Sequence, residues 1–386
     1  MPSAKLPGPI DLLGNLVSLP SVSSTQASLD QGNRAVVDTL AQWLQDLGFS
    51  IEIQDLQADG GKANLIATLG TGPGGLVLAG HTDTVPYDEA LWQYDPLRIT
   101  ESNERLYGLG STDMKGFFPL LLQAAQQFVD TPLQQPLIVL ATADEESSMQ
   151  GARALAAAGY PRARQAIIGE PTGLRPVRLH KGIMMEAIHI QGRSGHSSDP
   201  ELGVNALDGL HAVLGDLIDY RQSLRERFQH PAFAVQYPTL NLGCVHGGDN
   251  PNRICGSTEL HFDVRVTPGL SNALVREEIR QRIGRIAQSR NLEISMQSLI
   301  GGADSFEQAA GCELVQLAEK LTGHSSEAVA FATEASYMQQ LGMDTIVLGP
   351  GSINRAHQPD EYIELDQFQP CIDLLVQFIR HFCVQA

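Results

Sequence analysis

Four short apolar runs, each leading to a side chain that can bind a metal ion, constrain the fold of this chain more than any other feature. The runs occupy residues 76–80, 137–143, 166–169 and 345–349. Short apolar runs bounded by turn residues are typical of strands buried in a sheet. Because ligands of α/β sheets collect beyond the carboxyl ends of the strands, the residues that follow the runs should converge at one edge.

The residues that follow the runs are imidazoles and carboxylates. In chain order they are His81, Asp83, Glu145, Glu146, Glu170 and His357, the last of them reached through a turn rich in proline and glycine. Imidazole and carboxylate groups together form a ligand set for zinc-like cations. The sequence therefore predicts a metal site assembled from distant segments.

Composition excludes several classes of protein. With 386 residues, the chain is long for one hydrophobic core and suits two domains. A net charge of −18 argues against nucleic-acid binding, which needs clustered Lys and Arg. No apolar stretch approaches the length of a membrane span, and residues 1–10 lack the pattern of a secretory signal. Five cysteines without a Cys-x-x-Cys pair predict free thiols in a reducing cytoplasm.

The order of the predicted elements changes twice along the chain and indicates an inserted domain. Helices predicted at 33–47 and 115–128 alternate with the buried strands, as in α/β proteins. From residue 181 the order becomes strand, helix, strand, strand, helix, strand, which is the ferredoxin-like pattern. These elements are predicted at 184–190, 204–227, 239–245, 258–266, 272–289 and 292–296. We predict an α/β domain built from 1–180 and 298–386, with residues 181–297 inserted as a ferredoxin-like α+β domain.

Two interpretations are open for the pair His81 and Asp83, and two for Asp113 in the glycine-rich segment 108–116. On an extended segment His81 and Asp83 point the same way, so both could bind metal. We favour His81 as the ligand, with the Asp83 carboxylate holding its other ring nitrogen. Asp113, in the glycine-rich segment, could bridge two cations or cap the helix predicted near Lys115.

Glu145 and Glu146 are adjacent, so in extended chain they face opposite ways. That arrangement lets one glutamate bind metal while the other serves as a general base. A surface charge pair is the alternative, weakened here because the pair follows an apolar run.

The number of candidate ligands favours two metal ions over one. The candidates are His81, Asp113, Glu146, Glu170 and His357, whereas one zinc takes about three or four protein ligands. Two ions sharing Asp113 would each have three, with His81 and Glu170 on one and Glu146 and His357 on the other. Glu145 would then take a proton from a water shared by both ions and return it to a leaving amine.

Five motifs resemble those of the M20 family of dinuclear metallohydrolases, and the resemblance extends over the whole chain. They occupy residues 80–86, 110–116, 144–146, 169–172 and 356–361. The resemblance implies a zinc-peptidase-like catalytic domain, with a central mixed sheet flanked by helices, that holds two Zn²⁺ or Co²⁺ ions. It implies the ligand pairing given above, with Asp113 as bridge and Glu145 as base. It also implies that the inserted domain mediates homodimerisation.

The resemblance assigns roles to four residues of the insert. His196 matches a histidine that reaches into the partner subunit's active site and stabilises the tetrahedral oxyanion, although by itself it is a histidine in a polar turn. Asn252 and Arg265 match positions that bind the substrate carboxylate, a task suited to the forked guanidinium group. A turn and a strand-edge salt bridge are their structural alternatives. Lys181 stands directly before Gly182, where some relatives have Arg, which leaves a carboxylate contact open.

Further segments narrow the activity that the resemblance implies. Residues 195–200, 238–243, 252–255 and 349–354 are most similar to family members that act on N2-acetyl-L-ornithine. The implied reaction is hydrolysis of this small-molecule amide to L-ornithine and acetate, in arginine biosynthesis. Within the family, the alternatives are removal of succinyl groups from succinyl-diaminopimelate and general deacylation of N-acyl amino acids. Outside catalysis, the alternative is an idle relative that binds a peptide or partner.

Overall fold

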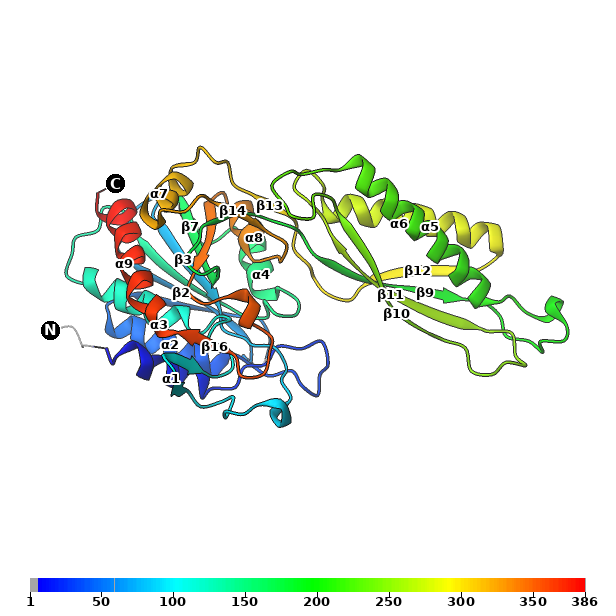
Figure 1. The fold of residues 1–386 in the computed structure, drawn as a ribbon, viewed down its shortest axis with the longest axis horizontal. Coiled ribbons are helices and arrows are strands. Elements are labelled where there is room, and N and C mark those ends of the chain that lie inside the picture. The colour runs from blue at the N-terminus through cyan, green and yellow to red at the C-terminus, as the bar shows by residue number, and fades with distance from the viewer. Residues whose placement is uncertain (1–5, 59, 386) are drawn as a thin grey trace. The chain divides into compact units, whose positions relative to one another are not determined.

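The computed structural model describes residues 6–58 and 60–385, and the chain divides into two compact units (Figure 1). Unit 1 contains the chain up to Arg178, Gln308–Glu327 and the chain from Thr333 onwards. Unit 2 contains Leu179–Glu307 and Ala328–Ala332. The predicted insert, 181–297, lies within unit 2. Unit 1 is therefore assembled from segments on both sides of unit 2 in the sequence.

The α-helices and strands alternate in unit 1. The strands are β1 (Ser50–Asp55), β2 (Ala63–Leu69), β3 (Leu76–His81), β4 (Thr100–Ser102), β5 (Arg105–Tyr107), β6 (Leu137–Thr142), β7 (Gln165–Pro171), β15 (Asp344–Gly349) and β16 (Tyr362–Glu364), while β8 (Val177–His180) and β14 (Glu327–Val329) start in unit 1 and end in unit 2. The helices are α1 (Pro9–Val17), α2 (Arg34–Asp46), α3 (Phe117–Ala125), α4 (Gln150–Ala158), α7 (Glu313–Thr322), α8 (Ala335–Gln340) and α9 (Phe368–Ile379).

The central sheet of unit 1 is mixed, as predicted. Its strands follow the order β1-β2-β6-β3-β7-β15-β8. The four middle strands β6, β3, β7 and β15 run parallel, and β1, β2 and β8 are antiparallel to their neighbours. The parallel strands are those predicted from the four apolar runs, so their carboxyl ends meet at one edge of the sheet. A smaller antiparallel sheet has the order β16-β5-β4.

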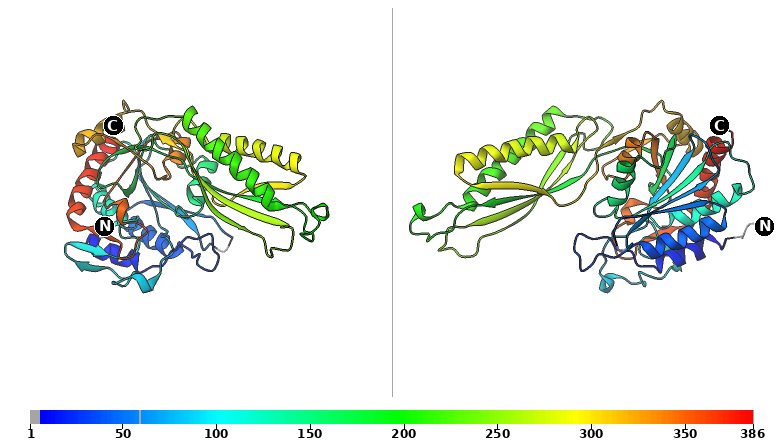
Figure 2. Two further views of the ribbon diagram at one scale, coloured as in Figure 1. Left: turned by 45° about the vertical axis from the view of Figure 1, so that its right-hand side comes forward. Right: turned by 180° about the vertical axis from the view of Figure 1, so that it is seen from behind.

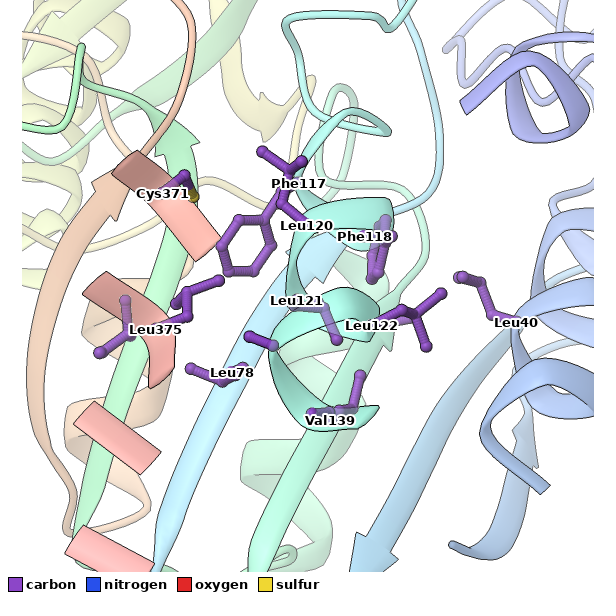
Figure 3. Close-up of a cluster of buried hydrophobic side chains, with 14 of the residues drawn as sticks. Leu40, Leu78, Phe117, Phe118, Leu120, Leu121, Leu122, Val139, Cys371 and Leu375 are labelled. Carbon is purple, nitrogen blue, oxygen red and sulfur yellow. The ribbon is translucent and has the colours of Figure 1, made fainter. Parts of the chain in front are cut away.

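Both faces of the parallel strands are buried, which explains why they are continuously apolar in sequence. Leu76 and Leu78 of β3 belong to the main hydrophobic core, which also takes in residues of α1, α2, α3 and α9. Figure 3 shows Leu78 and Val139 close to α3 in this core. The intervening β3 residues Val77 and Ala79 are equally buried on the opposite face.

Unit 2 has the predicted ferredoxin-like order of elements. These are β9 (Met184–Gln191), α5 (Ala206–Arg227), β10 (Thr239–Gly247), β11 (Ser257–Arg265), α6 (Asn272–Arg290) and β12 (Glu293–Ser298), and β13 (Phe306–Glu307) follows them. The sheet is antiparallel with the order β10-β11-β9-β12. Both helices cover the same face of this sheet (Figures 1 and 2), and they pack on residues such as Leu260 and Phe262. Residues between these, such as Glu259 and His261, are half-buried on the other face.

The structure also tests the predicted helix at 115–128 and the predicted free thiols. The helix predicted at 115–128 is shorter than expected, because α3 begins at Phe117 and a 3₁₀ turn, Gln126–Phe128, follows it. All five cysteines lie in the described part of the chain and are free thiols.

Among the described residues, no helix combines the length and apolarity needed to cross a bilayer.

Candidate metal centre

The carboxyl edge of the parallel strands collects residues from separate segments of unit 1. His81 ends β3, Glu170 lies in β7, and Glu145 and Glu146 follow β6. Two more residues come from loops, Asp113 from the loop before α3 and His357 from the loop after β15.

Asp113 lies between the two histidines. Its Oδ1 is 3.0 Å from His81 Nε2, and its Oδ2 is 3.3 Å from His357 Nε2. Glu146 Oε1 is 2.9 Å from His357 Nε2, and Glu170 Oε1 is 3.7 Å from His81 Nε2. Each histidine thus shares Asp113 and has one further carboxylate beside it, which is the arrangement that two ions bridged by Asp113 would require.

The donor atoms are close enough to hold divalent cations. One donor atom from each of His81, Asp113 and Glu146 lies within 4.8 Å of the others, and the same holds for His81, Glu145 and Glu170. Burial, followed by the charge of Glu170, raises the pKa of Glu145 well above its usual range. Burial, followed by the charge of Asp113, raises the pKa of Glu170 in the same way. Closely packed buried carboxylates favour a bound cation, because positive charge offsets their desolvation and mutual repulsion.

The carboxylates also raise the pKa values of the two histidines. Hydrogen bonds with Asp113 and Glu146 raise the pKa of His357 to about 11. Burial opposes protonation of His81, yet the bond with Asp113 and the surrounding carboxylates raise the pKa of His81 well above its usual range. Metal ions bind neutral imidazole, so a cation here would displace these protons.

Asp83 does not hold His81 in the way the sequence predicted. The Nδ1 atom of His81 is 3.0 Å from the backbone oxygen of Asp83 and 3.7 Å from its carboxylate Oδ1. The Asp83 carboxylate instead accepts hydrogen bonds from the backbone N–H groups of Glu145, at 3.2 Å, and Glu146, at 3.0 Å. The main chain of Asp83 therefore orients the imidazole, and its side chain holds the turn that carries both glutamates.

Glu145 and Glu146 lie in a turn, so the prediction that they occupy extended chain is wrong. β6 ends at Thr142, and Asp144 has a left-handed φ of 62°. The Asp144 carboxylate accepts hydrogen bonds from Lys62 Nζ at 2.6 Å and Ser23 Oγ at 2.7 Å. Both glutamates lie near His81, but the turn still separates them, because Glu146 contacts His357 while Glu145 groups with Glu170. With a side chain 7% exposed, Glu146 is not part of a surface charge pair.

Glu361 is a buried carboxylate that sequence reasoning did not single out, although it ends the motif at 356–361. It accepts hydrogen bonds from the backbone N–H groups of Gly110, Thr112 and Asp113 at 2.9, 2.8 and 2.9 Å. Burial raises the pKa of Glu361 to about 8. The loop that carries Asp113 is thus held from 248 residues further along the chain. Asp113 itself does not cap α3, whose N-terminus has no side-chain cap.

We expect Glu361→Ala to lower metal affinity and kcat/KM by about 10- to 100-fold, because residues that hydrogen-bond to the segments carrying metal ligands keep those ligands in position. The substitution leaves three buried N–H groups without their acceptor, so the loop that carries Asp113 loses its anchor. Metal titration and steady-state kinetics would measure the loss. Glu364→Ala, three positions away on β16 with a side chain 40% exposed, is the control and should keep both properties. Unchanged metal affinity in Glu361→Ala would contradict the anchoring role.

A second carboxylate missed from the sequence is Glu334, which immediately precedes α8. It is 1% exposed, and its Oε2 accepts a hydrogen bond of 2.9 Å from Thr142 Oγ1 at the end of β6. Its other oxygen, Oε1, is buried without a hydrogen-bond partner among the described residues. Burial raises the pKa of Glu334 to about 7. A short apolar run at residues 328–332 ends just before Thr333 and Glu334, and this run is the local signal that could have indicated Glu334.

The structure brings together two of the candidates in unit 2, His196 and Asn252. Both are exposed on loops, where the backbone N–H of Ser197 donates to the backbone oxygen of Asn252 at 3.1 Å. Ser198 Oγ lies 2.7 Å from His196 Nδ1 and holds the ring at that nitrogen.

The two cationic candidates of unit 2 already have partners. Arg265, the last residue of β11, lies 3.1 Å from Asp263, which is the strand salt bridge considered as its alternative. Lys181 Nζ donates to the backbone oxygen of Tyr237 at 2.7 Å. Burial and the nearby Arg265 lower the pKa of Lys181.

Comparison with known proteins agrees with this combination of fold and residues. Residues 77–381 match the model of peptidase family M20/M25/M40. The chain is 46% identical over 380 residues to an acetylornithine deacetylase from Photorhabdus laumondii subsp. laumondii, and the match covers 98% of each protein. This chain therefore belongs to peptidase family M20/M25/M40.

Solved structures of other family members share the fold at low sequence identity. A metallo-carboxypeptidase of the M20 family from Sulfolobus solfataricus has a TM-score of 0.77 and 18% identity, covering 98% of this chain and 99% of its own. A dinuclear metal-binding peptidase of the family from Bacillus subtilis has a TM-score of 0.66 and 14% identity, with coverage of 96% and 97%. The α/β sheet and the ferredoxin-like unit are thus features of the family fold.

Proposed function

We propose that this chain is a metal-dependent amide hydrolase that converts N2-acetyl-L-ornithine to L-ornithine and acetate in arginine biosynthesis. The observation that carries the reaction type is the placement of Asp113 between His81 and His357, with Glu145 beside His81. The choice of substrate rests on the 46% identity to an acetylornithine deacetylase. Five free thiols fit a reducing compartment, and we place the enzyme in the cytoplasm.

We assign the residues at the sheet edge as ligands of two divalent cations, Zn²⁺ or Co²⁺. His81, Glu170 and Asp113 would hold one ion, and His357, Glu146 and Asp113 the other. Bound cations of this kind lower the pKa of a water molecule and polarise an amide carbonyl. The contacts of Asp113 with both histidines, and of Glu146 with His357, support the assignment.

Glu145 is our candidate for the general base. Its carboxylate accepts one proton from the attacking water while the water oxygen bonds to the amide carbon. The same carboxyl group returns the proton to the nitrogen as the carbon–nitrogen bond breaks, so the products are the amine and acetic acid, which ionise to ammonium and acetate. Glu145 suits this task because Asp83 fixes its backbone and leaves its side chain beside His81 and Glu170.

We assign the remaining roles to unit 2 of a homodimer. His196 would reach the active site of the partner subunit and donate a hydrogen bond to the developing oxyanion. Asn252 and Arg265 would bind the carboxylate of the substrate, and Lys181 is a third candidate for that contact. The exposure of His196 and its closeness to Asn252 support a shared task for these two residues.

The function is tested by turnover on a panel of substrates with Zn²⁺- or Co²⁺-loaded protein. The panel contains N2-acetyl-L-ornithine, N-succinyl-L,L-diaminopimelate and an N-acetyl derivative of a neutral amino acid. We expect kcat/KM to be highest for N2-acetyl-L-ornithine, by about tenfold or more, because specificity is a difference in transition-state binding. Faster turnover of the succinyl or neutral substrate would assign the enzyme to another branch of the family.

Metal dependence is the control for this experiment. Chelator-treated protein should lose turnover and regain it when Zn²⁺ or Co²⁺ is added back. Metal-loaded protein that is folded and turns over no member of the panel would favour a binding protein without catalysis. Full activity after complete metal removal would overturn the metal assignment.

A further inference from the structure

A second group of potential metal ligands lies in unit 2, on the sheet face opposite the helices. Cys244 and His246 come from β10, and His261 and Glu259 come from β11. Cys244 Sγ is 3.0 Å from His246 Nε2, and one donor atom from each of Cys244, His246 and His261 lies within 4.8 Å of the others. The Nε2 atom of His261 also contacts Glu259 Oε1. Two imidazoles and a thiol therefore lie together, with the Glu259 carboxylate in contact with one of the imidazoles.

A β-bulge at Gly243 creates this group. Before the bulge Leu242 pairs with Phe262, and after it Cys244 pairs with His261, so Gly243 is the extra residue. Strict alternation would place Cys244 on the same face as Leu242, which packs against the hydrophobic core. The extra residue reverses the alternation and turns Cys244 toward the face that carries His261.

The same shift brings His246 beside the group. His246 pairs with Glu259 after the bulge, two positions beyond Cys244 on the same face. The rings of His246 and His261 then meet edge to face, with centroids 5.7 Å apart. Glu259 is held from the next strand, because its Oε2 lies 3.2 Å from Nδ1 of His189 in β9.

The geometry matches the demands of a zinc-like ion. Zinc–sulfur and zinc–nitrogen distances of about 2.3 and 2.0 Å place tetrahedral donors about 3.3–3.7 Å apart. The separation of 3.0 Å between Cys244 Sγ and His246 Nε2 is within a small side-chain adjustment of that spacing. A contact with Glu259 from His189 resembles the outer hydrogen bonds that orient metal ligands.

We propose that Cys244, His246 and His261, with Glu259 beside His261, form a binding site for a thiophilic divalent cation such as Zn²⁺. The site differs in chemistry from the carboxylate-rich centre of unit 1, because it contains a thiolate ligand. β10 is an edge strand, and its ladder with β11 is interrupted at the bulge. A cation bound across the two strands ties the edge strand to β11 where backbone pairing is weakest, and so stabilises unit 2.

The test uses the thiolate as a spectroscopic label. Metal-free full-length protein is titrated with Co²⁺, and absorption and bound metal per chain are recorded together. We expect a thiolate-to-cobalt charge-transfer band in the near ultraviolet, which imidazole and carboxylate ligands alone do not produce. Cys244→Ser should remove the band and lower the bound metal by one ion per chain. His246→Ala should lower the bound metal by the same amount.

Matched controls separate this site from the catalytic centre. Cys312→Ser, at a half-buried free thiol in unit 1, should keep the band and the full amount of bound metal. Hydrolytic activity retained in Cys244→Ser would show that the variant is folded. A wild-type protein without the band at saturating Co²⁺, or a band that survives in Cys244→Ser, would overturn the proposal. This inference does not depend on the proposed reaction, because its readout is the thiolate band.

Discussion

Glu145→Ala should lower kcat by about 10²–10⁴-fold, the range that a positioned general base contributes. The carboxylate that accepts the water proton is removed, while every proposed metal ligand stays in place. Metal content should therefore remain close to that of the wild-type protein. The measurement pairs steady-state kinetics with elemental analysis of the bound metal, so that loss of the base is distinguished from loss of a ligand.

Two further variants sharpen the assignment of Glu145. Glu145→Gln keeps the shape of the side chain but cannot accept the proton, so it should be nearly as inactive as the alanine variant. Glu101→Ala changes an exposed glutamate of β4 in the same unit and should leave kcat unchanged. Turnover close to the wild-type rate in Glu145→Ala would remove Glu145 from the mechanism, and a parallel loss of metal would make it a ligand.

His196→Ala should lower kcat by about 10²–10³-fold, the loss typical when one oxyanion donor is removed. Metal content should not change, because His196 belongs to unit 2 and the proposed ligands belong to unit 1. His211→Ala is the matched control, since His211 is an exposed histidine of α5 in the same unit. Full activity in His196→Ala would overturn the oxyanion role.

Mixed dimers test whether His196 acts across the subunit boundary. A chain with His196→Ala still has its own Glu145, and a chain with Glu145→Ala still has its own His196. When the two variants are co-assembled, each mixed dimer regains one complete site, and random pairing should restore about a quarter of wild-type activity. No gain over the separate variants would contradict action in the partner site and leave His196 within its own chain.

The placement of His81 and Glu170 at the sheet edge was predictable because each combines two local signals in the sequence. A buried parallel strand is continuously apolar, and a polar residue at its end is visible as a break in the run. His81 and Glu170 are recognised in this way, since both lie in strands whose other residues are buried. The ferredoxin-like unit was predictable for a similar reason, because its order of elements is a property of the sequence.

Residues whose role depends on distant backbone were not predictable. Glu361 is important because its carboxylate accepts hydrogen bonds from three backbone N–H groups about 250 positions earlier in the chain. No feature of the sequence around Glu361 indicates those bonds. The Asp83 carboxylate holds the turn of Glu145 and Glu146 for the same kind of reason. The turn itself depends on the left-handed conformation of Asp144, which sequence alternation does not reveal.

The sequence by itself determined the type of chemistry, because the kinds of residue and the apolar runs before them are local properties. It determined neither the partners of these residues nor the face of a sheet to which each side chain points. Cys244 shows the difference most clearly, since strict alternation buries it and the bulge at Gly243 turns it toward His261. Register and long-range hydrogen bonds arise only when strands pair, and for that reason only the tertiary structure decided them.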